Sequence, residues 1–390
     1  MTWETTTVLA NTVPAPLGAG MVRSHKAFEV AIDARWLRSG LGTYTYQLLA
    51  GLSKLRSQMS VRAIVSKQNT QVVSPFCKSL RIVNAPIYTI REQIEMPGAV
   101  RGCDLLHVPH YNIPIAYRGP LIATIHDLTH LLNRAYSHSL RSWFYARPML
   151  KFVASRADHI LTVSNYSRKH IIERLNVDPS KVTTVHCGVG AQFRPLCRET
   201  ARADISATLQ VSGPYLLFVG NLKPHKNVGT LLQAFRDLMN RGMDHHLIVV
   251  GDDRLGRPAI LQQIQDLALS ERVKVFASVD PHSLVNLYVA ADALVLPSFD
   301  EGFGLPVIEA MSCGTPVICS RAASLPEIGG DAAEYFDPRS RDELVAAIRR
   351  LLDSKDLRLQ MRENGLSRAK QFTWEASAMQ HYQAYARLSC

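Results

Sequence analysis

Two glutamates, Glu301 and Glu309, stand with seven residues between them in the passage from Pro297 to Pro316. The four residues after Glu301 are Gly302, Phe303, Gly304 and Leu305. The backbone N–H groups of such a glycine-rich turn can hold a phosphate, and carboxylates accept hydrogen bonds from sugar hydroxyls. The passage therefore indicates a site for a phosphate that is flanked by hydroxyl-rich groups.

The elements around these glutamates decide where they lie. Ala293 to Leu296 is a short apolar run of the kind that forms a buried parallel strand. Pro306 suits the first turn of a helix, and Gly314 suits the position just past its end. We therefore expect Glu301 on the loop at the strand's carboxyl end and Glu309 in the first or second helical turn. The helix dipole and the free N–H groups of the turn then point into the crevice where open α/β sheets bind ligands.

The passage resembles the signature of the family 4 retaining glycosyltransferases (glycosyl transferases group 1), which have the GT-B fold and use nucleotide sugars. The resemblance implies that Glu301 lies beside the donor sugar and that Glu309 holds the ribose of the nucleotide. It extends over nearly the whole chain from about residue 28 and includes Leu325-Pro326-Glu327 and the passage 372–375. The alternative is an ordinary strand–turn–helix in which both glutamates are merely solvated. The length of the matching passage favours the functional interpretation.

A second passage, from Phe218 to Asn227, combines a strand end with cations. It contains Gly220, Asn221, Lys223 and Lys226. Cations and backbone amides at the start of a helix can bind a diphosphate together. In the resembling family an Arg commonly follows the glycine and a Lys lies a few residues on. Lys226 matches that Lys, whereas Asn221 stands at the Arg position, so Lys223, together with His225, is expected to replace the lost charge. An ordinary loop with exposed lysines is the alternative.

His126 follows the apolar run 121–125 and is expected at the carboxyl edge of the first sheet. The resemblance implies that its imidazole faces and orients the donor sugar, although a lone His after a strand is more often structural. Asp127 is expected to fix this loop or to contact the acceptor. Gly40 and Gly42 form a turn before a helix, where backbone can approach a bound group closely. The resemblance places this turn beside the donor phosphates and the acceptor.

Ser278 and Val279 follow a strand of the second half. The resemblance implies that backbone groups in this stretch hold the nucleotide base. Because main-chain groups do the recognition, the side chains here reveal little about which base is bound.

The chain alternates strand-like and helix-like segments, which is typical of doubly wound α/β sheets. At 390 residues it is too long for one ordinary core, so two domains are expected. With the resemblance, the fold class is α/β, a GT-B fold of two Rossmann-like domains that face a central cleft. The expected divisions are a loose leader at 1–24, an acceptor-side domain at 25–200, a donor domain at 201–373, and a helix at 374–390 that crosses back to the first domain.

Strands are expected at 28–32, 61–65, 105–108, 121–125, 159–163, 182–186, 215–219, 247–250, 273–276, 293–296, 317–318 and 333–336. Helices are expected at 136–155, 165–175, 227–241, 259–269, 281–290, 341–353 and 355–370, with a further helix through Leu55 after the Gly40–Gly42 turn. A linker is expected at 192–213.

The charge is uneven along the chain. Residues 1–200 carry 24 Lys and Arg against 11 Asp and Glu, a net charge of +13, whereas the remainder carries 20 against 22. Nucleic acid, an anionic membrane or an acidic acceptor could each explain this excess. Residues 133–156 combine the cations Arg134, Arg141, Arg147, Lys151 and Arg156 with Trp143, Phe144 and Tyr145. Such a helix could lie on an anionic membrane surface or bury its aromatic residues in the core, and both interpretations stay open.

Other chemistries find little support in the composition. No stretch approaches the ~20 apolar residues of a membrane-spanning helix. Seven cysteines without paired spacing argue for reduced thiols, and no Cys/His group has zinc-like spacing. We expect a cytoplasmic protein that needs no metal or other cofactor, with peripheral contact to the cytoplasmic face of the membrane as a further option.

The sequence thus predicts a retaining glycosyltransferase that moves a sugar from a nucleoside diphosphate sugar to a glycan or lipid-linked acceptor, in cell-surface polysaccharide or glycolipid assembly. His126, Glu301 and Lys226 are its expected catalytic residues. The resemblance is closest to bacterial mannosyltransferase-like members, which favours GDP-mannose as donor. A glycosidase would leave the basic diphosphate site unexplained. A nucleotide-sugar epimerase of the same fold is the main alternative. A nucleic-acid-binding protein ranks last, because no reading helix or aromatic RNA surface is recognisable.

Overall fold

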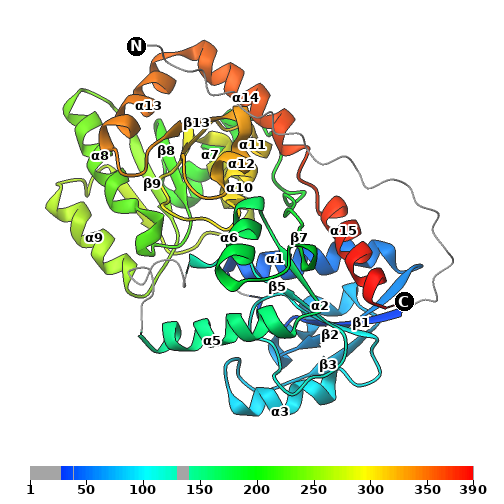
Figure 1. Ribbon diagram of the computed structural model, residues 1–390. Coiled ribbons are helices and arrows are strands. Elements are labelled where there is room, and N and C mark those ends of the chain that lie inside the picture. The colour runs from blue at the N-terminus through cyan, green and yellow to red at the C-terminus, as the bar shows by residue number, and fades with distance from the viewer. Residues whose placement is uncertain (1–27, 38, 130–139, 390) are drawn as a thin grey trace, which may run out of the picture.

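The computed structural model describes residues 28–37, 39–129 and 140–389, so the expected leader and the first part of the basic segment 133–156 lie outside the described residues. Two lobes lie against each other, and each consists of one parallel sheet packed between helices (Figure 1). The predicted α/β fold with two Rossmann-like domains is confirmed.

The described part of the first lobe has a seven-stranded sheet in the order β3-β2-β1-β4-β5-β6-β7. Its strands are β1 Phe28–Asp33, β2 Met59–Val65, β3 Ser79–Ile82, β4 Leu105–Val108, β5 Leu121–Thr124, β6 His159–Thr162 and β7 Val182–Thr184. Its helices are α1 Ser39–Leu52, α2 Thr70–Val73, α3 Ile90–Ala99, α5 Leu140–Arg156 and α6 Asn165–Leu175. The central strands are buried on both faces, which explains why they appear in the sequence as continuous apolar runs.

The second lobe has a six-stranded parallel sheet in the order β10-β9-β8-β11-β12-β13. Its strands are β8 Tyr215–Val219, β9 His246–Val250, β10 Val273–Phe276, β11 Ala293–Leu296, β12 Val317–Ser320 and β13 Ala333–Phe336. Its helices are α7 Arg198–Leu209, α8 Val228–Asn240, α9 Gly256–Asp266, α10 Pro281–Ala290, α11 Leu305–Cys313, α12 Leu325–Gly329, α13 Arg341–Asp353 and α14 Lys355–Ala369. β8 and β11 lie side by side although β9 and β10 separate them in the chain, so the loops after these two strands meet at one edge.

Every predicted strand is present, with ends that differ by two residues at most. The sequence analysis missed β3 and α3. β3 is an edge strand whose Ile82 is 52% exposed, and α3 leaves Ile90 and Ile94 in solvent and contains Pro97. Neither element therefore shows the alternation of buried and exposed residues on which the sequence analysis depended.

The predicted linker at 192–213 is wrong over most of its length, because α7 occupies residues 198–209. α7 packs against α10 of the second lobe, so the lobes divide before α7 and not at residue 200. The chain passes between the lobes a second time just before residue 374. The two crossings are joined by a hydrogen bond from the Val189 N–H to the Phe372 carbonyl at 3.1 Å.

The last helix, α15 Trp374–Leu388, returns to the first lobe and packs against α1, as predicted (Figure 1). The Tyr382 ring stacks on the Phe28 ring with a centroid distance of 6.0 Å. A chain of buried polar side chains then fixes this helix to the sheet below the cleft.

That chain joins residues of α15, α1, β4 and β5. His381 Nδ1 lies 2.8 Å from the carbonyl oxygen four residues earlier, which can only accept, so Nε2 accepts from the Tyr44 hydroxyl at 2.7 Å. The Tyr385 hydroxyl lies 2.7 Å from His107 Nδ1, and His107 Nε2 lies 2.8 Å from Thr124 Oγ1. The Thr124 hydroxyl is 3.3 Å from the Tyr44 oxygen. One set of proton positions satisfies all these contacts, which is what buried polar groups require.

Candidate functional site

A cleft of about 490 Å³ lies between the lobes, at the carboxyl ends of strands from both sheets. The predicted residues that line it are Gly40, His126, Gly220, Asn221, Lys223, Lys226, Glu301, Gly302, Phe303, Gly304, Leu305 and Glu309. Residues that lie far apart in the sequence are thus brought together where open α/β sheets bind ligands.

Lys226 and Glu301 form an ion pair inside this cleft. Lys226 Nζ lies 2.6 Å from Glu301 Oε1, and Ser298 Oγ donates to the same oxygen at 2.8 Å. The side chains of Lys226 and Glu301 are 12% and 9% exposed. Lys226 ends a short 3₁₀ helix after β8, and Glu301 follows β11, the neighbouring strand. Because little water surrounds them, their attraction is stronger than that of a surface pair.

The glycine-rich turn leads into α11, as predicted. Gly304 is the N-cap residue with a φ of 98°, a conformation that favours glycine. Ser324 Oγ lies 2.9 Å from the carbonyl oxygens of Glu301 and Phe303. Since the C=O and N–H of one peptide point in opposite directions, the following N–H groups point away from Ser324. Together with the helix dipole, this arrangement can stabilise an anion in front of α11.

Glu309 lies in the second turn of α11, as predicted. The Tyr288 hydroxyl donates to Glu309 Oε2 at 2.8 Å. Burial raises the pKa of Glu309 to about 7, although this hydrogen bond opposes the rise. One bond leaves most of the acceptor capacity of the carboxylate for a ligand hydroxyl.

His126 follows β5 at the first lobe's side of the cleft. Its Nε2 lies 3.0 Å from the Pro109 carbonyl, which can only accept, so this nitrogen carries the proton. The Tyr44 ring packs edge-on against the imidazole at 4.6 Å between centroids. Burial lowers the pKa of His126, so the ring is neutral at pH 7 and presents Nδ1 as an acceptor. A neutral acceptor of this kind suits a sugar hydroxyl.

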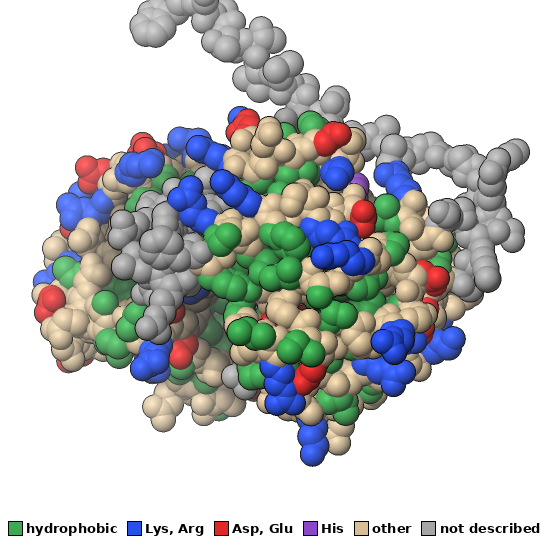
Figure 2. All heavy atoms as spheres, turned by 60° about the horizontal axis from the view of Figure 1, so that its bottom comes forward, with side chains coloured by type: hydrophobic (Ala, Val, Ile, Leu, Met, Phe, Trp, Pro, Cys, Tyr) green, Lys and Arg blue, Asp and Glu red, His purple; other side chains and the backbone are tan. Residues whose placement is uncertain are grey.

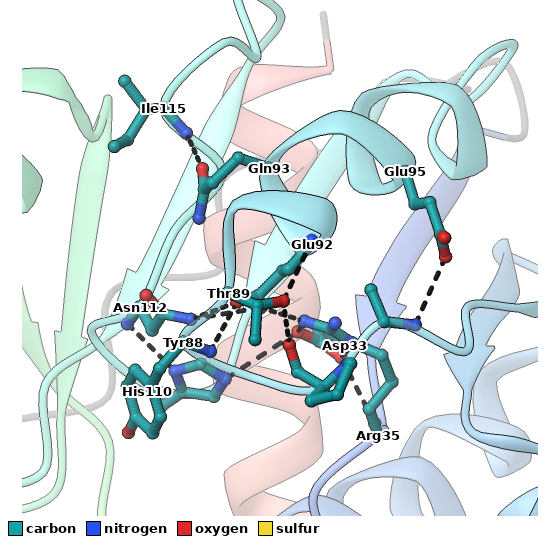
Figure 3. A network of polar contacts seen from close by, with 12 residues as sticks. Asp33, Arg35, Tyr88, Thr89, Glu92, Gln93, Glu95, His110, Asn112 and Ile115 are labelled. Atoms are coloured by element: carbon teal, nitrogen blue, oxygen red, sulfur yellow. Dashed lines mark hydrogen bonds and ion pairs between the residues drawn. The ribbon is translucent and has the colours of Figure 1, made fainter.

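A buried network holds the loop that positions His126 (Figure 3). Arg35 forms ion pairs with Asp33 at 2.7 Å and with Glu92 at 2.5 Å. Asn112 Nδ2 donates to the Glu92 carboxylate at 2.9 Å, which ties the 109–112 loop to α3. Burial opposes ionisation of Asp33, but the charge and hydrogen bonds of Arg35 outweigh it and lower the pKa of Asp33. Asp33 therefore stays charged, and the network fixes the carbonyl that His126 contacts.

Two predicted glycines lie differently from the expectation. α1 begins at Ser39, so Gly40 and Gly42 lie inside the first turns of the helix and not in a turn before it. Gly40 lines the cleft, whereas Gly42 packs against the Leu37 carbonyl. Ser278 and Val279 follow the edge strand β10, and the described residues that line the cavity do not include them or Gly42.

Direct contacts hold the two lobes together beside the cleft. Gly302 packs so closely against the other lobe that a Cβ would lie 2.9 Å from the His126 carbonyl oxygen. Glu327 of α12 accepts hydrogen bonds from the first two N–H groups of α6, at 2.8 and 3.1 Å, and its Oε1 lies 2.8 Å from His186 Nε2. Burial raises the pKa of Glu327, but these donors outweigh it and lower the value. The carboxylate of one lobe thus caps a helix of the other.

The sequence analysis missed Asp300, which lines the cleft, and four side chains that contact the predicted residues: Tyr44, Tyr288, Ser298 and Ser324. Ser298 and Asp300 lie inside the signature passage and could have been found there, because they stand within three positions before Glu301. Tyr44 and Tyr288 lie within helices rich in apolar residues, where a tyrosine resembles any other core residue. Only their tertiary contacts reveal them.

A larger cavity of about 610 Å³ lies elsewhere, where the chain crosses between the lobes. It is lined by residues of 189–195 and of 366–375, and not by strand ends. The smaller cleft is the better candidate for chemistry, because it holds the buried ion pair and the start of α11.

The six cysteines in the described part of the chain are free, and Cys313 and Cys319 are buried as expected for packing residues. Among the described residues, no group of three or more His, Cys, Asp or Glu side chains could hold a metal ion. No helix within the described residues is long and apolar enough to cross a bilayer.

Comparison with known proteins identifies relatives of both lobes. Residues 202–368 match the family described as "Glycosyl transferases group 1", and residues 38–193 match "Glycosyltransferase Family 4". O-antigen chain mannosyltransferase B of Escherichia coli is 32% identical over 285 residues, which cover 73% of this chain and 74% of the relative. D-inositol 3-phosphate glycosyltransferase of Segniliparus rotundus is 29% identical over 66% of this chain, and the match spans 59% of that relative's length.

Solved structures share the fold. Sucrose-phosphate synthase from Thermosynechococcus elongatus superposes with a TM-score of 0.75 at 23% identity, over 93% of this chain and 99% of that one. The Anabaena protein HepE in complex with UDP-glucose has a TM-score of 0.76 at 17% identity, over 92% and 100%. The arrangement of the two lobes is therefore the GT-B fold, as predicted.

Proposed function

Because this chain belongs to the family 4 glycosyltransferases, we propose that it moves mannose from GDP-mannose to an acceptor hydroxyl and retains the anomeric configuration. The observation that carries the proposal is the Lys226–Glu301 pair beside the start of α11, inside the cleft between the lobes. A buried cation, a helix start and a carboxylate at one point suit a sugar attached to a diphosphate.

Each residue has a separate task in this proposal. Lys226, Lys223 and the N–H groups of the glycine-rich turn bind the diphosphate. Glu301 positions the donor sugar and Glu309 accepts from the ribose. His126 accepts from a hydroxyl of the sugar through Nδ1, which its bond to the Pro109 carbonyl leaves free of a proton.

The chemistry follows from where charge develops. The bond between sugar and diphosphate breaks through an oxocarbenium-like transition state, and negative charge grows on the departing phosphate. Preorganised cations and amides stabilise that charge without reorganising. The acceptor approaches on the same face, and the leaving phosphate takes its proton, so no protein nucleophile takes part. Lys223 and Lys226 supply the positive charge that the diphosphate needs, so the proposal includes no metal ion; transfer that persists in EDTA is expected.

The nucleotide and the sugar are proposed from the relatives. Mannose transfer by O-antigen chain mannosyltransferase B supports mannose and a role in surface polysaccharide assembly. The inositol phosphate relative and the UDP-glucose complex concern other acceptors and another donor, which makes donor identity the first point to test.

The proposal includes contact between the first lobe and an anionic membrane, where lipid-linked acceptors are found. Exposed apolar side chains of this lobe support it. The side chains of Ile90 and Ile94, one turn apart on α3, are 82% and 74% exposed, and Ile115 beside them is 47% exposed. Figure 2 shows hydrophobic side chains gathered on the face at the bottom of Figure 1, with Lys and Arg, and also some Asp and Glu, around them. Exposed apolar side chains can insert at the interface of an anionic bilayer, and nearby Lys and Arg can contact its headgroups. Free thiols support the cytoplasmic side.

Of the basic segment 133–156, α5 is described from Leu140. Tyr145 contacts Asn112 and Tyr88 and therefore packs against the protein. Arg156 donates to the Tyr117 and Gly119 carbonyls. Lys151 is exposed. These contacts favour packing for part of the helix, so the membrane proposal rests on α3 and not on the α5 aromatic residues.

Thermal-shift titration with GDP, UDP and ADP, followed by GDP-mannose, tests the donor site. GDP is expected to raise the melting temperature more than UDP or ADP, since binding to the folded state stabilises it. Stabilisation by UDP instead would overturn the choice of donor, and no shift with any nucleotide would overturn the site. Product analysis with a synthetic mannoside then reports retention or inversion.

A further inference from the structure

Two carboxylates from opposite lobes meet in the cleft, next to the residues assigned to the donor sugar. Asp127 follows His126 after β5, and Asp300 precedes Glu301 after β11. Both aspartates line the cleft, and so does Thr129, which interacts with each of them. Asp127 Oδ1 accepts from the Thr129 N–H at 2.9 Å, while Asp300 forms a side-chain hydrogen bond with Thr129.

Asp300 is the exceptional member of this pair. It is only 6% exposed, yet its Oδ1 is buried without a hydrogen-bond partner among the described residues. Lys226, a cation that acts on Asp300, is held at 2.6 Å by Glu301. A buried carboxylate oxygen that lacks a donor is costly, because it loses hydration without replacement. Such an atom in a cleft indicates that a bound molecule supplies the donor.

The groups around Asp300 define what that molecule can be. Burial, with the negative charges of Asp127 and Glu301, raises the pKa of Asp300 to about 6, although Thr129 and Lys226 oppose the rise. Tyr166 faces both aspartates, and burial raises the pKa of its hydroxyl to about 12, so it stays neutral. A negatively charged ligand group is therefore repelled from the two aspartates, whereas neutral hydroxyls can donate to both carboxylates at once.

We infer that Asp127 and Asp300 bind two neighbouring hydroxyls of the acceptor sugar and so form the acceptor subsite between the lobes. This inference rests on the proposed function, which places the donor sugar at His126 and Glu301. The acceptor must approach the anomeric carbon from a point beside that sugar. Asp127 is the chain neighbour of His126, and Asp300 is the chain neighbour of Glu301. Because one carboxylate comes from each lobe, the subsite is complete only when the lobes are together.

The test uses Asp127→Asn and Asp300→Asn, with Asp356→Asn as a matched control. Asp356 is exposed on α14, outside the residues that line the cleft. Transfer from GDP-mannose is measured with methyl α-D-mannopyranoside as acceptor probe and with water as competitor. Circular dichroism melting establishes that each variant is folded.

Both cleft variants are expected to raise the KM for the mannoside about tenfold or more, as loss of a charge-assisted hydrogen bond predicts, and to shift product toward free mannose. The KM for GDP-mannose should change by less than twofold, and the control should match the wild type.

Equal loss of affinity for donor and acceptor would overturn the inference, as would an unchanged mannoside KM or no use of the mannoside by the wild type. A melting-temperature rise with Mg²⁺ that Asp300→Asn abolishes would make the pair a cation site and would also overturn it. If the wild-type protein fails to bind any nucleotide, the proposed function itself fails, and that result is separate from these.

Discussion

The Lys226 ammonium lies 2.6 Å from the Glu301 carboxylate, although 75 positions separate the two residues in the chain. The contact exists because β8 and β11 are neighbours in the second sheet. Within this ion pair each charge neutralises the other. When a diphosphate sugar binds, Lys226 can contact its phosphates and Glu301 can contact its sugar.

Replacing Lys226 with Met removes the cation and leaves Ser298 as the donor to the Glu301 carboxylate among the described residues. We expect kcat to fall about 10²- to 10³-fold, because charge on the departing phosphate is no longer stabilised, as for loss of one preorganised donor. Steady-state kinetics with GDP-mannose measure this. The exposed Lys355→Met on α14 serves as control, and normal turnover in Lys226→Met would remove the proposed diphosphate site.

Glu309 links donor binding to pH. Burial raises its pKa to about 7, so the carboxyl gains its charge as the pH rises from 6 to 8. An ionised carboxylate accepts hydrogen bonds from the ribose more strongly than the neutral acid. GDP affinity should therefore increase over this range in the wild type, beyond the ionisation of GDP itself. Calorimetry of Glu309→Gln should show only the contribution from GDP, and parallel pH profiles for both proteins would contradict the assignment.

Glu327 is expected to govern how the lobes stay together. Its carboxylate accepts from two N–H groups of α6 and pairs with His186, so Glu327→Gln removes a charge from the positive end of a helix. At about 1 kcal/mol for such an interaction, the closed arrangement loses roughly fivefold in population. Small-angle scattering should show a larger radius of gyration, and donor KM should rise. Glu363→Gln, an exposed substitution on α14, is the control. Identical scattering from both variants would count against this role.

The buried His381 makes stability depend on pH. Burial lowers its pKa to about 4, against 6.5 in the unfolded chain. The unfolded state therefore binds more protons between these values, so this contribution to stability is complete above pH 6.5 and is lost as the pH falls toward 4. The slope for one proton is about 1.4 kcal/mol per pH unit. In urea unfolding, His381→Gln should be less stable at pH 7 and should lose less stability on acidification. A difference between the two proteins that is constant with pH would contradict the neutral, buried imidazole.

The exposed α3 isoleucines should govern membrane binding. The double variant Ile90→Ser and Ile94→Ser is expected to lose sedimentation with phosphatidylglycerol vesicles at low salt, since it removes the apolar anchor and keeps the cations. Leu359→Ser, at a side chain that is 50% exposed on α14, is the matched control. Equal pelleting with phosphatidylcholine, or loss in the control as well, would argue against an electrostatic and apolar contact through α3.

Local patterns were enough to place most of the site on its elements. The apolar run at 293–296, Pro306 and Gly314 fixed the strand–turn–helix around Glu301 and Glu309, because each acts through near neighbours in the chain. The linker predicted at 192–213 was wrong because local patterns do not show contacts between elements that are distant in the chain. Polar residues on α7 hide a helix whose buried face, with Ala201 and Ile205, is defined only by contact with α10.

The sequence by itself determined the fold class, the strand ends that carry the glycine-rich turn and Lys226, and the family, since these depend on local spacing and on residues of the signature. Only the tertiary structure decided which side chains meet: Tyr288 with Glu309, Glu327 with α6, and Asp127 with Asp300 across the cleft. Such pairings follow from strand order and from how two lobes pack, and burial then sets the charge of each group. A linear pattern contains neither the strand order nor the dielectric surroundings of a side chain, so the chemistry of the cleft could be described only after the chain was folded.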